Sequence, residues 1–149
     1  MAEAYPHIFT PIQIGTQTLP NRLIMGSMHT GLEERDGGID RMAAFYGERA
    51  KQGCALIITG GFSVNAAGQL DRKSASFNTP EIAQAHKPIP QAVHDHGGRI
   101  LLQILHAGRY GYHGEIVAPS PIRAPINKTV PREMTEAEIE QTIADFAQA

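Results

Sequence analysis

Three short clusters in this sequence combine residue types that could hold a small ligand and act on it. They are Gly26-Ser27-Met28-His29-Thr30, Gly60-Gly61, and Gln103 with His106-Ala107-Gly108-Arg109. Each cluster stands at or near the end of an apolar run that is typical of a buried strand. Because parallel α/β folds bind ligands at the carboxyl ends of their strands, we expect the chemistry of this protein at these three places.

The clusters contain the groups that a flat heteroaromatic ligand such as a flavin requires. Such a ligand needs close approach of the backbone, an apolar edge, and an amide that matches its alternating donors and acceptors. Gly60 and Gly61 lack Cβ and can let the backbone approach a ring. Gln103 offers an acceptor and two donors, which suit the pyrimidine edge of a flavin. Ser27 and Met28 could supply backbone and apolar contacts beside it.

Each of these residues also has a purely structural interpretation. A Gly-Gly pair after a strand is usually only a turn. Met28, taken alone, would be a core residue. Gln103 lies inside an apolar strand, where a buried amide needs partners, and function and structure are equally good explanations of it.

His29, His106 and Arg109 invite a catalytic or substrate-binding interpretation. A lone histidine at a strand end is more often a satisfied structural group. Arg109 could bind an anionic group of a substrate or cofactor, or it could pair with an acid such as Glu115. The sequence leaves these alternatives open.

Other kinds of site are not indicated. His94 and His96 are two residues apart and would not share a helix face, so we predict no metal site there. The glycine-rich stretches match neither the dinucleotide-binding Gly-x-Gly-x-x-Gly pattern nor the P-loop. There is also no Gly-x-Ser-x-Gly motif of a hydrolase.

Composition narrows the class of protein. The chain has 149 residues, is 42% hydrophobic and 19% charged, and carries a formal net charge of -2. This balance offers no basic surface for nucleic acid or an anionic membrane. Cys54 is the single cysteine, which rules out an internal disulfide and a multi-cysteine cluster within these residues. No basic residue precedes Arg22 and no long apolar run occurs there, so we expect a cytoplasmic protein without a membrane span.

The clusters must be positioned by strands and helices that alternate along the chain. Residues 8–20 predict a small hairpin or capping segment. Unbroken apolar runs predict buried parallel strands at 22–28, 54–59 and 100–105.

Helices are predicted between these strands. Asp40 can cap the first helix, and Gly53 occupies the place of a C-terminal glycine. The second covers residues 82–96, with Pro88 and Pro90 expected to start it or kink it.

A proline-rich crossing and a last helix follow the third strand. Residues 117–131 contain too much proline to continue a ladder. Thr135 and Glu138 then form a capping-box pattern. The apolar stripe of this helix is Ile139, Ile143 and Phe146.

The alternation of strands and helices predicts an α/β fold. Three βα units alone would leave an open sheet edge, which finished domains of this class avoid by closing into a barrel. The last helix stops inside its apolar stripe. We therefore expect the N-terminal portion, about three βα units, of a truncated TIM (β/α)8 barrel. Residues 1–149 would form one incomplete domain, with the βα units over 22–149.

The residues also carry a specific resemblance to the old yellow enzyme family. Residues 21–28 (Asn-Arg-Leu-Ile-Met-Gly-Ser-Met) resemble the first barrel strand of that family, 56–61 the second, and 103–109 the third. Ala118-Pro119-Ser120 follows in the expected place. The extended stretch 26–34 (Gly-Ser-Met-His-Thr-Gly-Leu-Glu-Glu) is similar to the bacterial NADPH-dependent 2,4-dienoyl-CoA reductases in particular.

The resemblance implies an FMN site and the positions that form it. It places Ser27, Met28, Gly60 and Gln103 where the family contacts FMN, and His29 beside the mouth of the active site. Arg109 is a second candidate for the substrate side. No catalytic acid is expected among these 149 residues, because the proton-donor tyrosine, the flavin-binding histidines and the late phosphate site of the family would all follow Ala149. An iron-sulfur cluster and an FAD and NADPH region are likewise expected only downstream.

In the complete enzyme, the implied reaction is reduction of the C=C bond of an enoyl-type substrate, 2,4-dienoyl-CoA, with NADPH in fatty acid β-oxidation. The partners would then be this thioester and NAD(P)H. One alternative is a related enoate reductase or NADH:flavin oxidoreductase. Another is a non-catalytic fragment, and we expect the chain alone to have no dienoyl-CoA reductase activity.

Overall fold

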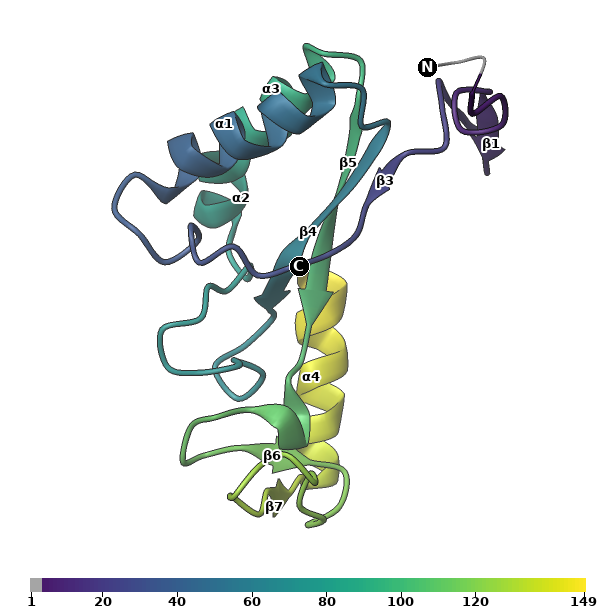
Figure 1. The fold of residues 1–149 in the computed structure, drawn as a ribbon. Coiled ribbons are helices and arrows are strands. Elements are labelled where there is room, and N and C mark those ends of the chain that lie inside the picture. The colour runs from purple at the N-terminus through teal and green to yellow at the C-terminus, as the bar shows by residue number, and fades with distance from the viewer. Residues whose placement is uncertain (1–3) are drawn as a thin grey trace. The chain divides into compact units, whose positions relative to one another are not determined.

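The computed structural model describes residues 4–149, which form two compact units. Among the described residues, the first unit is made of 4–60 and Ala85–Gln103, and the second of Gly61–Gln84 and Ile104–Ala149. Figure 1 shows the strands and helices of both.

The first unit begins with an antiparallel hairpin. Strand β1 covers Ile12–Ile14 and β2 covers Gln17–Leu19, inside the segment for which the sequence predicts a hairpin or cap. Gly15 adopts a φ of +57°, a backbone conformation that favours glycine, at the turn between them. Leu19 is buried, whereas most of the hairpin is exposed.

A three-stranded sheet follows, with the order β3-β4-β5. β3 (Ile24–Met25) pairs with β4 (Leu56–Ser63) in parallel, with Ile24 opposite Leu56. β5 is Arg99–Leu105, close to its predicted limits. The parallel order confirms the α/β prediction for the portion of the barrel that the chain contains.

Two predicted strand limits are wrong. The first strand has two residues rather than the seven of 22–28, because the chain leaves the ladder after Met25 and Ser27 and Met28 are exposed. The second strand continues through Gly60-Gly61 to Ser63. The Gly-Gly pair is therefore part of a strand, and its interpretation as a turn is wrong.

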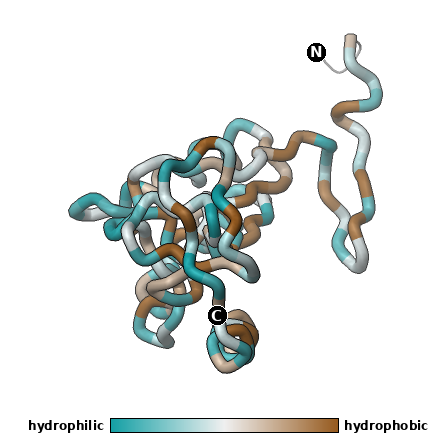
Figure 2. The backbone as a smooth tube through the Cα atoms, turned by 90° about the horizontal axis from the view of Figure 1, so that it is seen from below, coloured by the Kyte–Doolittle hydropathy of each residue, from teal (hydrophilic) through white to brown (hydrophobic). Residues whose placement is uncertain are grey.

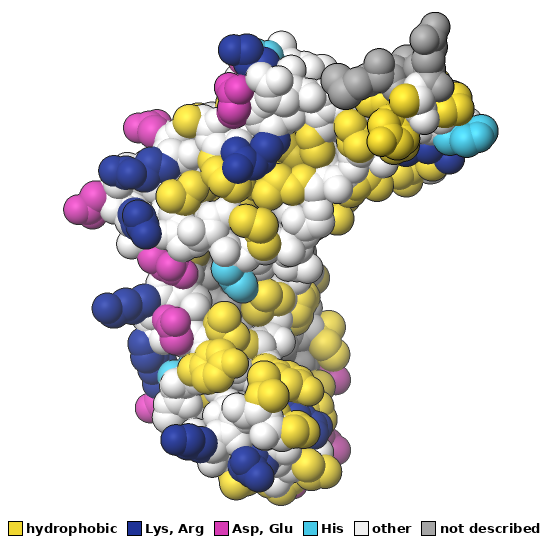
Figure 3. All heavy atoms as spheres, in the orientation of Figure 1, with side chains coloured by type: hydrophobic (Ala, Val, Ile, Leu, Met, Phe, Trp, Pro, Cys, Tyr) yellow, Lys and Arg dark blue, Asp and Glu magenta, His cyan; other side chains and the backbone are white. Residues whose placement is uncertain are grey.

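Helix α1 (Gly38–Lys51) follows β3 and precedes β4 in the sequence. Its N-cap residue is Gly37, whose φ is +67°, so Asp40 lies in the first turn and the prediction that it caps the helix is wrong. A carboxylate there still interacts favourably with the helix dipole. The C-terminal end agrees with prediction: Gly53 follows it with a φ of +97°. Acidic and basic side chains are interspersed over the exposed face of α1 (Figure 3).

The predicted helix over 82–96 is two helices. α2 covers Pro80–His86 and α3 covers Pro88–His94. The break falls at Pro88, which has no N–H to donate and whose ring clashes with the preceding turn. α3 lies alongside α1 (Figure 1), where the Cβ of Ala92 approaches Gly47. Ile89 and Val93 of α3 are buried within the first unit.

The second unit contains the loops that follow β4 and β5. A 3-10 helix, η1 (Gly108–Tyr110), follows β5. β6 (Val117–Ala118) then pairs in parallel with β7 (Arg132–Glu133). The prediction that residues 117–131 stay outside any ladder is therefore wrong at its first two residues. Val117 and Ala118 are buried, and the prolines of the crossing lie outside the paired residues.

Helix α4 (Glu136–Gln148) is the last element of the second unit. The predicted capping box is confirmed: Thr135 Oγ1 accepts from Glu138 N at 3.3 Å, and Glu138 Oε2 accepts from Thr135 N at 2.8 Å. In Figure 2, where α4 is seen end-on beside the C-terminus, hydrophobic and hydrophilic residues occupy different sides. None of its residues is buried. Within the described residues, no helix combines the length and the apolar character needed to cross a membrane.

Candidate functional site

Ser27 and Gln103 form the centre of a polar cluster at the strand ends of the first unit. Ser27 Oγ donates to Gln103 Oε1 over 2.7 Å. Both side chains are exposed, so the expectation of a buried amide at Gln103 is wrong. Since its carbonyl oxygen is held by the serine, the amide is fixed in one orientation and its two N–H donors have no acceptor among the described residues.

Thr59 fixes the backbone beneath this pair. Its Oγ1 accepts from the backbone N–H of Gln103 at 3.0 Å and donates to the carbonyl of Gly60 at 2.8 Å. The threonine is only 4% exposed, where a satisfied hydroxyl is strongly favoured. A single side chain therefore sets the positions of two neighbouring strands at the cluster. Sequence reasoning missed Thr59, although a threonine before Gly-Gly in an apolar run was a usable signal.

Met28 and His29 continue the cluster from β3. Met28 is 51% exposed, so its interpretation as a core residue is wrong. An apolar side chain half open to solvent beside a fixed amide offers the apolar edge that a planar ring needs. His29 is also exposed.

Gly60 approaches the protein's own chain. A Cβ on this residue would lie 2.8 Å from the carbonyl oxygen of Met28, 2.8 Å from Glu33 Oε1 and 3.2 Å from His29 Cα. Glu33 in turn accepts hydrogen bonds from Thr30, at 3.4 Å from N and 3.0 Å from Oγ1. The absent side chain of Gly60 therefore lets the segment from Met28 to Glu33 pack against β4. Sequence reasoning gave Glu33 no role.

A buried tyrosine lies behind the same glycine. The hydroxyl of Tyr46, on α1, has no hydrogen-bond partner among the described residues. Burial raises the pKa of Tyr46, and the Glu33 carboxylate adds to the rise. The backbone of Gly60 and the charge of Arg49 oppose it. The raised pKa keeps the phenol protonated at neutral pH.

The remaining candidates belong to the second unit. Arg109 lies in η1, where its carbonyl oxygen accepts from Asn127 Nδ2 at 3.2 Å. Glu115 pairs with Arg72 rather than with Arg109. His106 Nδ1 accepts from Gly108 N at 3.1 Å, and burial, with a smaller contribution from His113, lowers the pKa of His106. This ring is therefore neutral at physiological pH.

Metal binding finds no support in the described part of the chain, where no group of three or more His, Cys, Asp or Glu residues could hold an ion. His94 and His96 are exposed near the end of α3. What the strand ends of the first unit offer is an oriented amide, a hydroxyl and an exposed thioether. These groups can bind the polar and apolar edges of one flat heteroaromatic ring.

Comparison with known proteins agrees with this chemistry. Residues 7–149 match the NADH:flavin oxidoreductase / NADH oxidase family. A curated relative is the N,N-dimethylglycine/sarcosine dehydrogenase of Chromohalobacter salexigens, at 36% identity over 97% of this chain and 22% of that protein. This chain thus spans less than a quarter of that relative's length.

Solved structures show the same similarity in the fold. A 2-naphthoyl-CoA reductase in complex with 2-naphthoyl-CoA superimposes with a TM-score of 0.83 and 25% identity, over 95% of this chain and 24% of that one. The old yellow enzyme homologue of Zymomonas mobilis gives 0.78 and 29%, over 96% and 44%. The chain corresponds to the N-terminal part of these TIM barrels, and it belongs to the NADH:flavin oxidoreductase / NADH oxidase family, that of the old yellow enzymes.

Proposed function

We propose that the strand ends of the first unit hold the FMN that this family implies. The observation that carries the proposal is the exposed Ser27–Gln103 pair, held at 2.7 Å beside the half-exposed Met28. In this arrangement the amide N–H groups of Gln103 bind acceptors on the pyrimidine edge, and Met28 covers an apolar part of the ring. Ser27 contributes by fixing the amide.

Gly60 contributes through its backbone. The place of its missing side chain is filled by the segment from Met28 to Glu33, so the glycine acts by letting that segment and β4 come together. His29, exposed next to Met28, and Arg109, the middle residue of η1, are our candidates for the substrate side. The histidine can donate or accept a hydrogen bond, and the arginine can bind an anionic group.

The proposed reaction of the whole protein is reduction of a conjugated C=C bond of an enoyl thioester. Bound FMN supplies hydride transfer. The residues of this chain bind and orient the ring. We propose that residues outside this chain supply the acid that protonates the substrate and bind an FAD and a 4Fe-4S cluster. Cys54 alone cannot hold such a cluster.

The substrate that we propose is 2,4-dienoyl-CoA, reduced with NADPH by a cytoplasmic enzyme of fatty acid β-oxidation. Two observations support it. Residues 26–34 resemble the dienoyl-CoA reductases, and the 2-naphthoyl-CoA reductase, a structural relative, was solved with a conjugated CoA thioester. Another enoate reductase or NADH:flavin oxidoreductase activity is the alternative within the same family.

The 36% identity to N,N-dimethylglycine/sarcosine dehydrogenase favours a second candidate, oxidation of a methylated amine. The two candidates differ in the role of the organic substrate, which would accept electrons in the first and donate them in the second. In the first, NADPH would be the electron donor and the thioester the acceptor, whereas in the second the amine would be the donor. Steady-state assays can therefore separate them.

The test uses the protein expressed from the complete gene that encodes this chain. Oxidation of NADPH is followed anaerobically with 2,4-dienoyl-CoA, with 2-cyclohexenone, and with NADH replacing NADPH. Reduction of the flavin by sarcosine is followed separately. We expect the dienoyl thioester to give the highest kcat/KM. Flavin reduction by sarcosine without thioester-dependent NADPH oxidation would overturn the proposal, and the 149-residue chain alone should show no turnover.

A further inference from the structure

The second unit contains a pocket that the proposed flavin site does not use. It has a volume of about 590 Å³ and is formed by the loop after β4, the loop after β5 and the approach to β7. Ala67 and Arg72 come from the first of these loops and Glu115 from the second, whereas Val117 belongs to β6 and Arg132 to β7. This volume lies within the range of about 300–1,000 Å³ that is usual for small-molecule sites.

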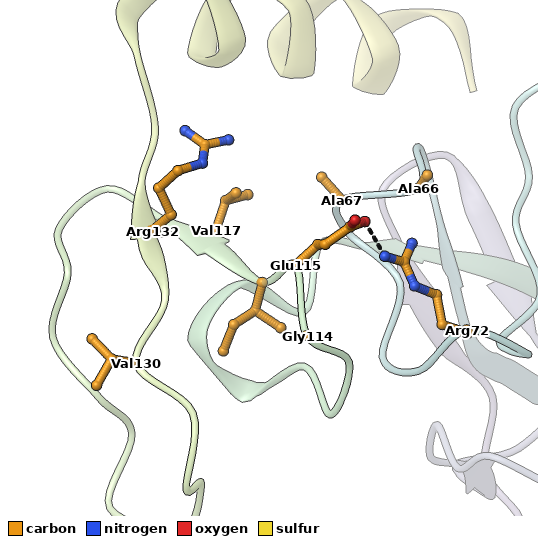
Figure 4. Close-up of a pocket in the computed structure, with 9 residues that line it drawn as sticks. Ala66, Ala67, Arg72, Gly114, Glu115, Val117, Val130 and Arg132 are labelled. Atoms are coloured by element: carbon orange, nitrogen blue, oxygen red, sulfur yellow. Dashed lines mark hydrogen bonds and ion pairs between the residues drawn. The ribbon is translucent and has the colours of Figure 1, made fainter.

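Two arginines give the pocket its charge. Arg72 pairs with Glu115, and Figure 4 shows these two side chains extending toward each other from different loops. Arg132 is held by Glu138, with Nη2 at 2.6 Å from Oε1 and Nη1 at 2.9 Å from Oε2. Among the lining residues the formal charges are two positive and one negative. Glu138 offsets the charge of Arg132, so an anionic ligand is favoured where it replaces Glu115 at Arg72.

Arg72 is the arginine that a ligand can engage. Its side chain is 51% exposed, and among the described residues only its Nη2 is occupied. Nε and Nη1 therefore keep donors in the planar arrangement that matches a phosphate or carboxylate. An exposed ion pair contributes little to stability, so exchange of Glu115 for a ligand anion costs little.

The rest of the lining is apolar. Val130 is 58% exposed beside the buried Val117, and Ala66 and Ala67 line the pocket from the loop after β4. A bare inorganic anion would leave these apolar side chains exposed to water. The combination fits a ligand that carries an anionic group on a larger, partly apolar body.

We propose that this pocket binds the phosphate-bearing end of an organic phosphate ligand, with Arg72 as the principal phosphate contact. The inference rests on the proposed function, in which two such ligands take part: the CoA end of the thioester and NADPH. The pocket is built from loops that follow β4 and β5, and (β/α)8 barrels bind their ligands with such loops.

The first experiment measures binding to the 149-residue chain by isothermal titration calorimetry. The probes are CoA, NADPH, pantetheine and inorganic phosphate. Pantetheine keeps the apolar arm of CoA but lacks its phosphates. CoA binding tighter than NADPH identifies the thioester as the source of the phosphate, and the reverse order identifies the nicotinamide cofactor. Pantetheine binding as tightly as CoA would overturn the proposal.

Variants then locate the site. R72Q should weaken binding of the preferred probe about tenfold, which corresponds to loss of one charge-assisted hydrogen bond. R72K, which keeps the charge but loses the planar fork, should give an intermediate loss. E115Q should bind more tightly than the wild type, because it removes the carboxylate that competes for Arg72.

The matched control is K73Q, which makes the same change of charge one residue away, at a side chain that does not line the pocket. Equal losses in R72Q and K73Q would mean non-specific attraction and would contradict the proposal, as would weaker binding in E115Q. Retention of FMN, read from the visible spectrum of the same samples, keeps the two proposals separate. A chain that holds FMN but shows no Arg72-dependent binding refutes the pocket alone.

Discussion

At the scale of single residues, Gly60 allows the segment that carries Met28 and His29, part of the proposed flavin site, to pack against β4. Its α-carbon faces the carbonyl of Met28, the carboxylate of Glu33 and the backbone of His29. Glu33 also holds Thr30, so the segment that carries Met28 and His29 is packed on one side and hydrogen-bonded on the other. Any side chain at position 60 must push this segment away from β4.

We predict that G60A destabilises the chain by about 1–3 kcal/mol, the usual cost of forcing a methyl group into a packed site. The new Cβ would lie 2.8 Å from two oxygen atoms. Urea unfolding, followed by circular dichroism, measures the change as a lower midpoint. The variant should also lose affinity for FMN, because Met28 and His29 move together with the segment.

G114A is the matched control. No atom lies within 4 Å of the position of its Cβ, and the residue is exposed. Its unfolding midpoint should equal that of the wild type. If G60A were as stable as G114A and bound FMN equally well, the packing role of Gly60 would be wrong.

Sequence reasoning identified the residues of the cluster better than it identified their environments. Ser27 and Gln103 lie 76 positions apart and meet at 2.7 Å, as their places at the ends of parallel strands suggest. The exposure of Gln103 and Met28 was not predictable, because an apolar run does not reveal which of its residues lack neighbours. The close contact between Gly60 and Glu33 depends on tertiary packing and left no local pattern.

At the scale of elements, α4 shows how a few polar residues define a helix that buries none of its side chains. Thr135 and Glu138 satisfy each other's backbone N–H groups, and Arg132 binds the same glutamate through two nitrogens. These contacts lower the pKa of Glu138 to about 2, with the hydrogen bond from Arg132 as the largest cause.

This depressed pKa predicts a pH dependence. A carboxylate whose pKa is lower in the folded than in the unfolded chain contributes stability above its unfolded pKa, about 4.3. That contribution is lost as the pH falls from there through about 2. The urea midpoint should therefore decrease over this range, and E138Q should remove part of the decrease. Asp145, whose pKa is lowered mainly by a hydrogen bond from Asn65, contributes to the remainder.

E136Q is the control for this measurement, since Glu136 lies in the same first turn but outside the capping box. Its midpoint should follow the pH as the wild type does. Equal pH profiles for E138Q and the wild type would contradict the assignment to Glu138.

Whether a segment forms a helix or a strand was more predictable than the residues at which it begins and ends. Helix ends were predicted correctly from the capping box, from Gly53 and from the proline break. Each of these features acts on the backbone within one turn. β3 ends early and β4 continues through two glycines, because the pairing of strands rather than their composition determines where they stop. The two-residue pairing of β6 with β7 joins segments about fifteen positions apart and escaped prediction for the same reason.

At the scale of the whole molecule, the chain contains a parallel three-stranded portion of a barrel whose relatives are longer. It spans 22% of the dimethylglycine/sarcosine dehydrogenase and 44% of the Zymomonas mobilis homologue. The parallel order and the fold class were predictable, because continuous apolar strands separated by helices allow few other topologies. The division into two units was not, since it reflects how densely distant segments pack.

The most direct test of the central claim is the visible absorbance spectrum of the 149-residue chain after addition of FMN and removal of the excess, with folding checked by circular dichroism. We predict that the wild-type chain and Q52L, a Gln-to-Leu control at the exposed end of α1, retain flavin. Q103L should bind FMN about tenfold more weakly, because it loses the fixed amide. A folded but colourless wild-type chain, or equal retention by Q103L and Q52L, would contradict the assignment of the flavin site.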